Sequence, residues 1–251
     1  MSTFKHYAQY YDLFYGDKNY AAEADYVNQR IKQHHPKTKT ILEFGCGTGK
    51  HATQLAQHGY AIHGIDLSPE MVHQAQHIHE GSPNLSFSHA DLRTVSLKKT
   101  FDTVVSLFHV MSYQTTNDDL TQAFVSAYKH LEPGGLFIFD CWYGPAVLTQ
   151  LPTIRVKRIE HNDLHITRIS EPQLHHDTNC VDVCFTIFIQ QKNFNIAETI
   201  QETHRMRYLF VPEIQDLFMR TGFVFKTVHA WLTDTAPDVS NWNICFVGQK
   251  L

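Results

Sequence analysis

The chain of 251 residues lacks the features that mark secreted and membrane-spanning proteins. It contains no run of about eighteen apolar residues, so no membrane-spanning helix is predicted. Its first residues lack the apolar core of a secretion signal, and its five cysteines are odd in number and scattered, unlike a disulfide framework. We therefore expect a cytoplasmic protein that does not bind membranes.

The chain also has no excess of basic residues and no obvious set of metal ligands. Lys and Arg number 21 against 25 Asp and Glu, a formal net charge of −4, which does not favour a nucleic-acid partner. Histidines number 18, and His73 and His77 are four apart on a predicted helix, but no third ligand stands out. We expect no metal, and a small molecule as the partner.

The most informative segment, residues 43–49, reads Glu-Phe-Gly-Cys-Gly-Thr-Gly and directly follows the apolar run 40–42. An apolar, β-branched run is typical of a buried strand, and glycines let the next loop turn sharply and approach a ligand. The dinucleotide-binding fingerprint needs glycine at its sixth position, where this chain has Lys50. The loop therefore indicates a nucleotide-like cofactor other than a dinucleotide.

Further motifs follow in order along the chain. Asp66 ends a second apolar strand, where a carboxylate can accept hydrogen bonds from ribose hydroxyls. Asp91-Leu92 follows a short strand, residues 101–108 form a strongly apolar strand, and Pro133-Gly134-Gly135 turns into another strand. In these motifs the chain resembles the class I S-adenosylmethionine-dependent methyltransferases. The resemblance implies their fold and S-adenosylmethionine as the cofactor.

Two segments narrow this resemblance: the tyrosine-rich residues 7–15, and residues 142–145, which read Trp-Tyr-Gly-Pro. With them the chain is similar to the branch that dimethylates the amino group of nucleotide-linked amino sugars. The likeness is strongest over residues 7–145. It also implies that the chain can form a homodimer through its later strands, although an exposed sheet face can equally be solvated.

Strands alternate with helices up to residue 141, which predicts an α/β fold. Together with the resemblance, this predicts a doubly wound, mostly parallel sheet of seven strands, the Rossmann-like methyltransferase fold. After residue 151, four segments with polar alternation predict an inserted antiparallel β-layer. We divide the chain into a cofactor-binding core with an N-terminal lid (1–150), the inserted layer (151–210) and a C-terminal completion of the core sheet (211–251). The expected core strands are 40–44, 60–66, 85–89, 101–108, 135–141, 223–231 and 242–249, with helices at 20–34, 50–58, 69–80, 117–131 and 212–221.

The resemblance implies a set of cofactor contacts. Asp66 takes the ribose hydroxyls, Leu67 and Met71 hold the adenine, and Tyr20 and Lys18 lie near the methionyl carboxylate. Packing in the core is an alternative explanation for Leu67 and Met71, as capping of a turn is for Asp91. The expected cofactor-binding residues are Tyr20, Glu43, Gly45, Cys46, Gly47, Gly49, Asp66, Leu67, Met71, Asp91, Leu92 and Phe108.

The candidates for catalysis are Tyr15 and His109. By resemblance, Tyr15 belongs to a lid over the methyl group, and its hydroxyl can bind the acceptor nitrogen. His109 follows the fourth strand, where an imidazole can accept a proton or orient the nitrogen. The alternative for His109 is a structural histidine at a strand end. The alternative for Tyr15 is an aromatic side chain that fixes an N-terminal helix by packing. The expected substrate-binding residues are Tyr11, Tyr113, Trp142 and Tyr143.

The prediction is an S-adenosylmethionine-dependent methyltransferase that acts on a small polar acceptor, the nitrogen of a nucleotide-linked amino sugar. O-methylation and methylation of another small amine are alternatives within this class. A protein that binds the cofactor without catalysis is the alternative outside it. Because the sulfonium is already a good leaving group, alignment in a dry site is the main requirement, and no metal or nucleophilic side chain is needed.

Overall fold

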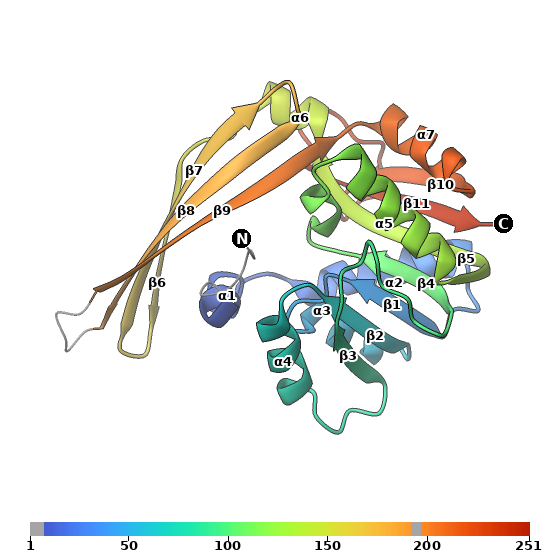
Figure 1. Cartoon of the computed structure of the whole chain (residues 1–251), viewed down its shortest axis with the longest axis horizontal. Coiled ribbons are helices and arrows are strands. Elements are labelled where there is room, and N and C mark those ends of the chain that lie inside the picture. The colour runs from blue at the N-terminus through green and yellow to red at the C-terminus, as the bar shows by residue number, and fades with distance from the viewer. Residues whose placement is uncertain (1–7, 192–196) are drawn as a thin grey trace.

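The computed structural model describes residues 8–191 and 197–251, which form an α/β fold around one large sheet (Figure 1). Seven strands of this sheet follow the order β3-β2-β1-β4-β5-β11-β10. The pairs from β3 to β5 are parallel, whereas β11 is antiparallel to both of its neighbours. The predicted doubly wound, mostly parallel sheet is therefore confirmed. Its strands are β1 (Thr40–Phe44), β2 (Ala61–Asp66), β3 (Leu85–His89), β4 (Phe101–Ser106), β5 (Leu131–Tyr143), β10 (Phe223–Ala230) and β11 (Asn243–Lys250).

Helices cover both faces of this sheet because its strands are apolar on both sides. In β1, Ile41 belongs to the core on one face and Leu42 to the core on the other, as the period of two in a strand requires. On the face of Ile41 lie α2 (Tyr20–His34), α3 (Lys50–Gln57) and α4 (Pro69–Ile78). On the face of Leu42 lie α5 (Asn117–Lys129) and α7 (Val211–Arg220).

Local signals place the starts of these helices where the sequence predicts them. The Asn19 side chain accepts a hydrogen bond from the Ala22 N–H at the start of α2, over 3.0 Å. Ser68 caps α4 by accepting from the Met71 N–H over 3.2 Å, with Pro69 in the first turn. Each cap satisfies a backbone donor that the helix itself leaves unpaired, which fixes the first turn.

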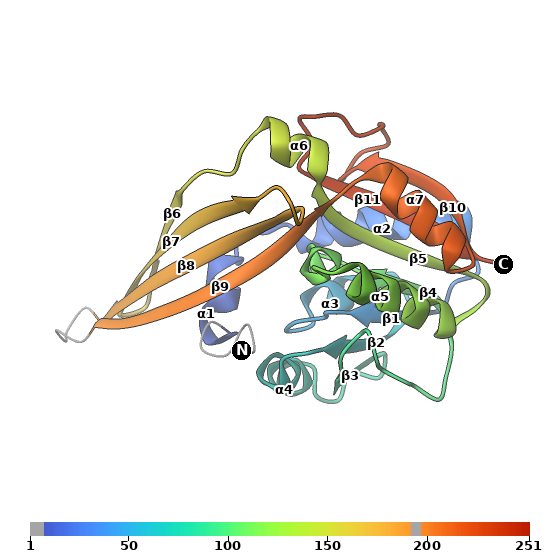
Figure 2. The same ribbon diagram turned by 45° about the horizontal axis from the view of Figure 1, so that its top comes forward.

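The remaining strands form the antiparallel layer that the sequence predicts: β6 (Arg155–His161), β7 (Leu164–His175), β8 (Cys180–Gln191) and β9 (Ala197–Leu209). The layer does not pack on the core sheet but continues it, because β9 pairs in parallel with the end of β5 at Trp142 and Tyr143. The layer reaches out beyond the carboxyl ends of β1 and β4 (Figure 2). The short helix α1 (Ala8–Phe14) packs beneath it, with Phe14 buried against Ile166 and Ile187, while α6 (Gly144–Thr149) links β5 to β6.

Several predicted boundaries shift by one or two residues, and two differ for clear backbone reasons. The predicted turn before strand 135–141 is an irregular part of β5, where Gly134 has a φ of +81° and the pairing with β4 shifts between Phe101 and Thr103. The predicted strand 101–108 ends at Ser106, because Phe108 and His109 have φ angles of +63° and +64°, outside the range of a strand. None of the described helices is long and apolar enough to cross a membrane.

The close approach of α7 to β11 yields a prediction about stability. A Cβ added at Gly248 would lie 2.2 Å from Cε1 of Phe218, a ring that is fully buried. We expect Gly248→Ala to lower the free energy of unfolding by about 1–3 kcal/mol, as overpacking of a core does, measured by urea denaturation. The double variant Gly248→Ala/Phe218→Leu should recover part of this loss. Equal stability of Gly248→Ala and the wild type would contradict the packing argument.

Candidate active site

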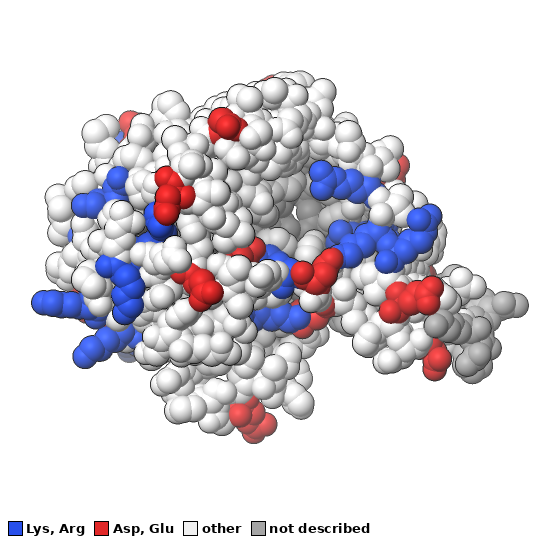
Figure 3. Space-filling view, turned by 180° about the vertical axis from the view of Figure 1, so that it is seen from behind, with Lys and Arg blue, Asp and Glu red and all other residues white. Residues whose placement is uncertain are grey.

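A cavity of about 850 Å³ lies where the carboxyl ends of β1, β2 and β4 meet the antiparallel layer. In the space-filling view a hollow separates the core from the layer (Figure 3). Ligands of doubly wound sheets bind at this edge, because the loops that follow the strands leave a crevice there. The predicted residues that line the cavity are Tyr15, Tyr20, Gly45, Cys46, Gly47, Asp66, Leu67, Met71, Asp91, Leu92, Phe108, His109, Tyr113 and Trp142.

Of the predicted site residues whose side chains are described, three are not among those that line the cavity. Glu43 lies in β1 and is buried, Gly49 is the last glycine of the loop and packs near the ring of Phe87, and Tyr143 packs against the core on the side of α5. Tyr11 belongs to α1, but its side chain lies outside the part of the chain that is described. The structure places Glu43, Gly49 and Tyr143 outside the lining of the cavity, and the contacts expected for them stay predictions.

The three glycines of the loop between β1 and α3 serve different purposes. A Cβ at Gly47 would meet no protein atom within 4 Å, so this stretch of backbone is open to a ligand. A Cβ at Gly45 would lie 2.4 Å from a methyl group of Val110, and one at Gly49 would lie 2.8 Å from the ring of Phe87. Close packing therefore requires Gly45 and Gly49, and only Gly47 is left free for approach by a cofactor.

Asp66 at the end of β2 holds this loop in place. One carboxylate oxygen accepts from the Gly47 N–H over 2.9 Å, and the other accepts from the Ser68 N–H over 2.8 Å. Burial raises the pKa of Asp66, although these backbone hydrogen bonds act in the opposite direction. Because a carboxylate has about four acceptor positions, Asp66 can still accept bonds from a ligand in the cavity that it lines.

Glu43 supports the loop from below and is only 1% exposed. Burial, together with the nearby charge of Asp66, raises the pKa of Glu43 to about 8. At neutral pH this side chain is therefore largely uncharged, and it acts as a structural carboxylic acid beneath the loop.

A buried charged network that the sequence did not single out borders the cavity beside Tyr20. Glu23 pairs with the ammonium of Lys18 and lies 2.7 Å from Nε2 of His51. Burial raises the pKa of Glu23, but these two partners outweigh it and lower the value to about 2. Lys18 itself lies over the rings of Tyr20 and Phe108, 4.6 Å from each centroid.

Because Lys18 is engaged by Glu23, it does not line the cavity, whereas Lys50 and His51 do. The expected place of Lys18 near the methionyl carboxylate stays a prediction, and the structure shows Lys18 beside the lining residues Tyr20 and Phe108. The only signal for the network in the sequence is an acidic residue, Glu23, on the apolar stripe of α2 beside Ala24 and Val27, where a charge needs a partner.

The turn after β4 aims two side chains into the cavity. The left-handed backbone of Phe108 and His109 costs on the order of 1–3 kcal/mol at each residue, a strain that often marks a functional site. The carboxylate of Asp140 accepts from the His109 N–H over 3.1 Å, and Nδ1 of the imidazole lies 2.7 Å from Oδ2. That second contact is out of line with the ring N–H, so it is a close polar contact and not an aligned hydrogen bond.

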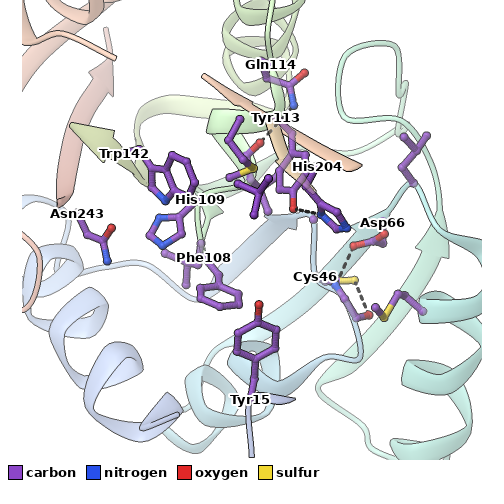
Figure 4. Close-up of a pocket in the computed structure, with 18 of the residues that line it drawn as sticks. Tyr15, Cys46, Asp66, Phe108, His109, Tyr113, Gln114, Trp142, His204 and Asn243 are labelled. Atoms are coloured by element: carbon purple, nitrogen blue, oxygen red, sulfur yellow. Dashed lines mark hydrogen bonds between the residues drawn. The ribbon is translucent and has the colours of Figure 1, made fainter. Parts of the chain in front are cut away.

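The opposite wall comes from α1 and the antiparallel layer. The Tyr15 hydroxyl accepts from the Arg168 guanidinium over 3.3 Å, and the Tyr15 ring meets that of Phe108 edge-on at 5.0 Å. Tyr113 and His204 are hydrogen-bonded across the cavity from Tyr15, and Trp142 stands beside His109 (Figure 4). Further lining residues that sequence reasoning missed are Arg155, Arg168, His204, Trp242 and Asn243.

Near α4 the cavity is lined by Leu67, Met71 and Leu92. Leu67 is 60% exposed there, and Met71 and Leu92 are buried beside it. The Asp91 carboxylate accepts from the Arg93 guanidinium and backbone, which lowers the pKa of Asp91. Asp91 therefore orders its turn and also lines the cavity. No cluster of three or more metal-binding side chains occurs within the described residues.

Comparison with known proteins agrees with this geometry. Residues 41–135 match a family model described as a methyltransferase domain. The chain is 29% identical to the putative methyltransferase YqeM of Bacillus subtilis, over 86% of this chain and 85% of that one. It is 28% identical to the dTDP-3-amino-3,4,6-trideoxy-alpha-D-glucopyranose N,N-dimethyltransferase of Streptomyces venezuelae, over 80% and 86%. The crystal structure of Streptomyces venezuelae DesVI shares the fold, with a TM-score of 0.81, 23% identity and 98% of each chain covered.

These matches, with the fold and the glycine loop, support an S-adenosylmethionine-dependent methyltransferase, and the chain is similar to enzymes of class I. The residues present fit its cofactor: Gly47 leaves backbone open, Asp66 offers a carboxylate, and Leu67 and Met71 offer apolar surface. More particularly, the chain is similar to N,N-dimethyltransferases of dTDP-linked amino sugars.

The buried acid beneath the loop yields a prediction about pH. Because the pKa of Glu43 in the folded protein is raised to about 8, its contribution to stability is complete below its unfolded pKa and is lost as pH rises through 8. As the pH is raised from 5 to about 9, the free energy of unfolding should fall less in Glu43→Gln than in the wild type, because glutamine does not titrate. Urea denaturation across this pH range measures the difference. Parallel stability curves for the two proteins would show that Glu43 does not titrate in this range.

Proposed function

We propose that this methyltransferase adds methyl groups to the amino nitrogen of a nucleotide-linked amino sugar. The observation that carries the proposal is the size and division of the cavity. Its volume of about 850 Å³ lies in the upper part of the range of about 300–1,000 Å³ for small-molecule sites, so an acceptor fits beside the cofactor. The cofactor half is lined by the core sheet, and the other half by the antiparallel layer.

The chemistry of the second half suits an anionic acceptor that carries a ring. Arg155 of β6 and Arg168 of β7 line it, and basic side chains gather on the layer beside the hollow (Figure 3). The rings of Trp142 and Trp242 meet edge-on, with their centroids 5.5 Å apart. Indole rings offer flat apolar surfaces on which a sugar ring or a nucleotide base can pack. Among the described lining residues the carboxylates are Asp66 and Asp91, both in the cofactor half, so the acceptor half favours a diphosphate.

In the cofactor half we assign roles residue by residue. The backbone of Cys46 and Gly47 contacts the cofactor, and Asp66 binds its ribose hydroxyls. Leu67 and Met71 pack against the adenine. The bound cofactor supplies an activated methyl group. The tasks of the chain are then to hold the acceptor in line and to exclude water, which Phe108 and the lid from α1 support.

His109 and Tyr15 are assigned to the acceptor nitrogen. Both line the cavity near the ring of Phe108, which lies 5.4 Å from His109 and 5.0 Å from Tyr15 between ring centroids. His109 orients the nitrogen or accepts its proton, with Asp140 behind it. The rival O-methyltransferase would need a true general base, since a hydroxyl must lose its proton as it attacks.

The wider setting is also a proposal. All five cysteines are free, which suits the reducing cytoplasm. We retain the division at residues 150 and 210, since β6 to β9 form one antiparallel unit. Leu151, Ile154 and Val156 are 48–65% exposed at the edge of that unit, which supports a homodimer there. A small-molecule acceptor, and not nucleic acid, fits the cavity.

The proposal is tested by incubating the protein with S-adenosylmethionine and a panel of dTDP-linked amino sugars, free amines and hydroxylated sugars. We expect S-adenosylhomocysteine to form only with the amino sugars, which gain one or two methyl groups by mass spectrometry. Transfer to a hydroxyl alone would overturn the acceptor assignment. Cofactor binding with no methylated product would favour the non-catalytic alternative.

The ribose assignment is tested by Asp66→Ala. Loss of a charged hydrogen bond costs about 1.5–3 kcal/mol, so we expect the Kd for S-adenosylhomocysteine to rise by about 10-fold or more in calorimetry. Asp102→Ala is the matched control, because Asp102 also accepts from backbone N–H groups, of Lys39 and Thr40, but lies outside the cavity. An equal loss of affinity in both variants would indicate general destabilisation and contradict the assignment.

The effect of replacing His109 distinguishes N-methylation from O-methylation. If His109 orients an amine, His109→Gln should retain part of the activity, with kcat lowered by about 10-fold. If His109 is the base of an O-methyltransferase, the same change should lower kcat by about 10²–10⁴-fold. Steady-state kinetics with the best acceptor distinguishes these outcomes.

A further inference from the structure

Besides His109 and Asp140, a second series of neighbouring titratable side chains begins at the cavity. The Tyr113 hydroxyl lies 2.8 Å from Nδ1 of His204. Nε2 of His204 lies 3.3 Å from the Glu202 carboxylate, two residues back on β9. Tyr113 and His204 line the cavity, and Glu202 does not. The three groups thus run in line from the cavity into the layer.

The exposure of these three groups indicates the direction in which a proton would move. The side chain of His204 is 4% exposed, and that of Glu202 is 12% exposed. Asp140, behind His109, is 1% exposed. A proton passed to Glu202 therefore lies closer to solvent than one passed to Asp140, because the Glu202 side chain is the more exposed of the two.

The surroundings keep the tyrosine neutral and the imidazole in place. Burial raises the pKa of Tyr113 well above its ordinary value, with the charges of Tyr15, Glu202 and Asp66 adding to the effect. The His204 ring meets that of Phe185 edge-on at 4.9 Å, and the Arg168 guanidinium covers the same Phe185 ring at 4.8 Å. Tyr113 can therefore pass a proton on without holding a negative charge.

We propose that Tyr113, His204 and Glu202 form a relay that removes the proton of the acceptor ammonium before methyl transfer. Tyr113 is the catalytic residue, since it faces the acceptor, and His204 and Glu202 are positioning residues that act through it. The inference rests on the proposed function, because it requires an amine as the acceptor.

The proton balance of the step is complete. The ammonium N–H proton passes to the Tyr113 oxygen as the Tyr113 proton passes to Nδ1 of His204, and the proton on Nε2 passes to Glu202. The neutral nitrogen then forms its bond to the methyl carbon as the carbon–sulfur bond breaks, with the electron pair left on sulfur. Glu202 releases its proton to water, so each methylation yields one proton.

The relay requires one tautomer of His204, and this is testable without an acceptor. Nitrogen-15 NMR of the histidine-labelled protein with S-adenosylhomocysteine should show His204 protonated at Nε2 and unprotonated at Nδ1, assigned by its loss in His204→Gln. Tyr113→Phe and Glu202→Gln should each perturb this signal. Protonation at Nδ1 in the wild type would overturn the relay, whatever the acceptor is.

The kinetic test uses the same variants with dTDP-3-amino-3,6-dideoxy-α-D-glucose as the probe. We expect Tyr113→Phe, His204→Gln and Glu202→Gln each to lower kcat by at least about 10-fold near pH 6.5, with the Kd for S-adenosylhomocysteine unchanged. The deficit should narrow towards about pH 9.5, because the free amine then loses its proton to water. A merely structural role would give a deficit that does not vary with pH, and that result would overturn the relay.

Matched controls in the same molecule are available. Tyr60→Phe removes a buried hydroxyl that donates to Asn28 outside the cavity, and His175→Gln breaks a His–Asp contact of 3.0 Å elsewhere in the layer. Neither should produce a deficit that depends on pH. If the wild type fails to methylate the amino sugar, the proposed function fails, whereas Nδ1 protonation of His204 with an active wild type overturns the relay alone.

Discussion

The left-handed turn at Phe108 and His109 is the constraint on which the rest of the site depends. Two non-glycine residues with positive φ persist because Asp140, buried in β5, accepts the His109 N–H. The turn leads directly into the 3₁₀ helix Val110–Tyr113, which Ser112 ties to β5 by accepting from the Trp142 N–H over 3.1 Å. Val110 then fills the space beneath Gly45. One strained connection thus aligns the glycine loop, the histidine and the tyrosine of the cavity.

The pairing of β9 with β5 adds the second wall. Only two register pairs, at Trp142 and Tyr143, join the antiparallel layer to the core sheet, so the layer leaves the core edge and overhangs the carboxyl ends of the strands. This overhang brings Arg168, Phe185 and His204 opposite the cofactor half. The cavity therefore has two chemically different sides: carboxylates and apolar side chains on the core sheet, and arginines and aromatic rings on the antiparallel layer.

Much of the core was predictable because its signals are local. The period of two in β1, the caps at Asn19 and Ser68, and the glycine loop each depend on neighbours within a few residues in the chain. The bulge at Gly134 was not predictable, because a Pro-Gly-Gly segment is also typical of a turn, and only pairing with β4 keeps it in the strand. Likewise, nothing local marks Glu23 and His51 as partners, since they lie on different helices.

The sequence by itself determined the fold class and the positions of the strand ends, caps and turns, because these depend on spacing along the chain, while the resemblance carried by its motifs implied the cofactor. The tertiary structure decided which of the predicted site residues line the cavity. It buried Glu43 beneath the loop, committed Lys18 to Glu23, and turned Tyr143 into the core. It also joined Tyr113 to His204 across 91 residues of chain. Such contacts depend on strand pairing and burial between distant segments, which no local pattern records.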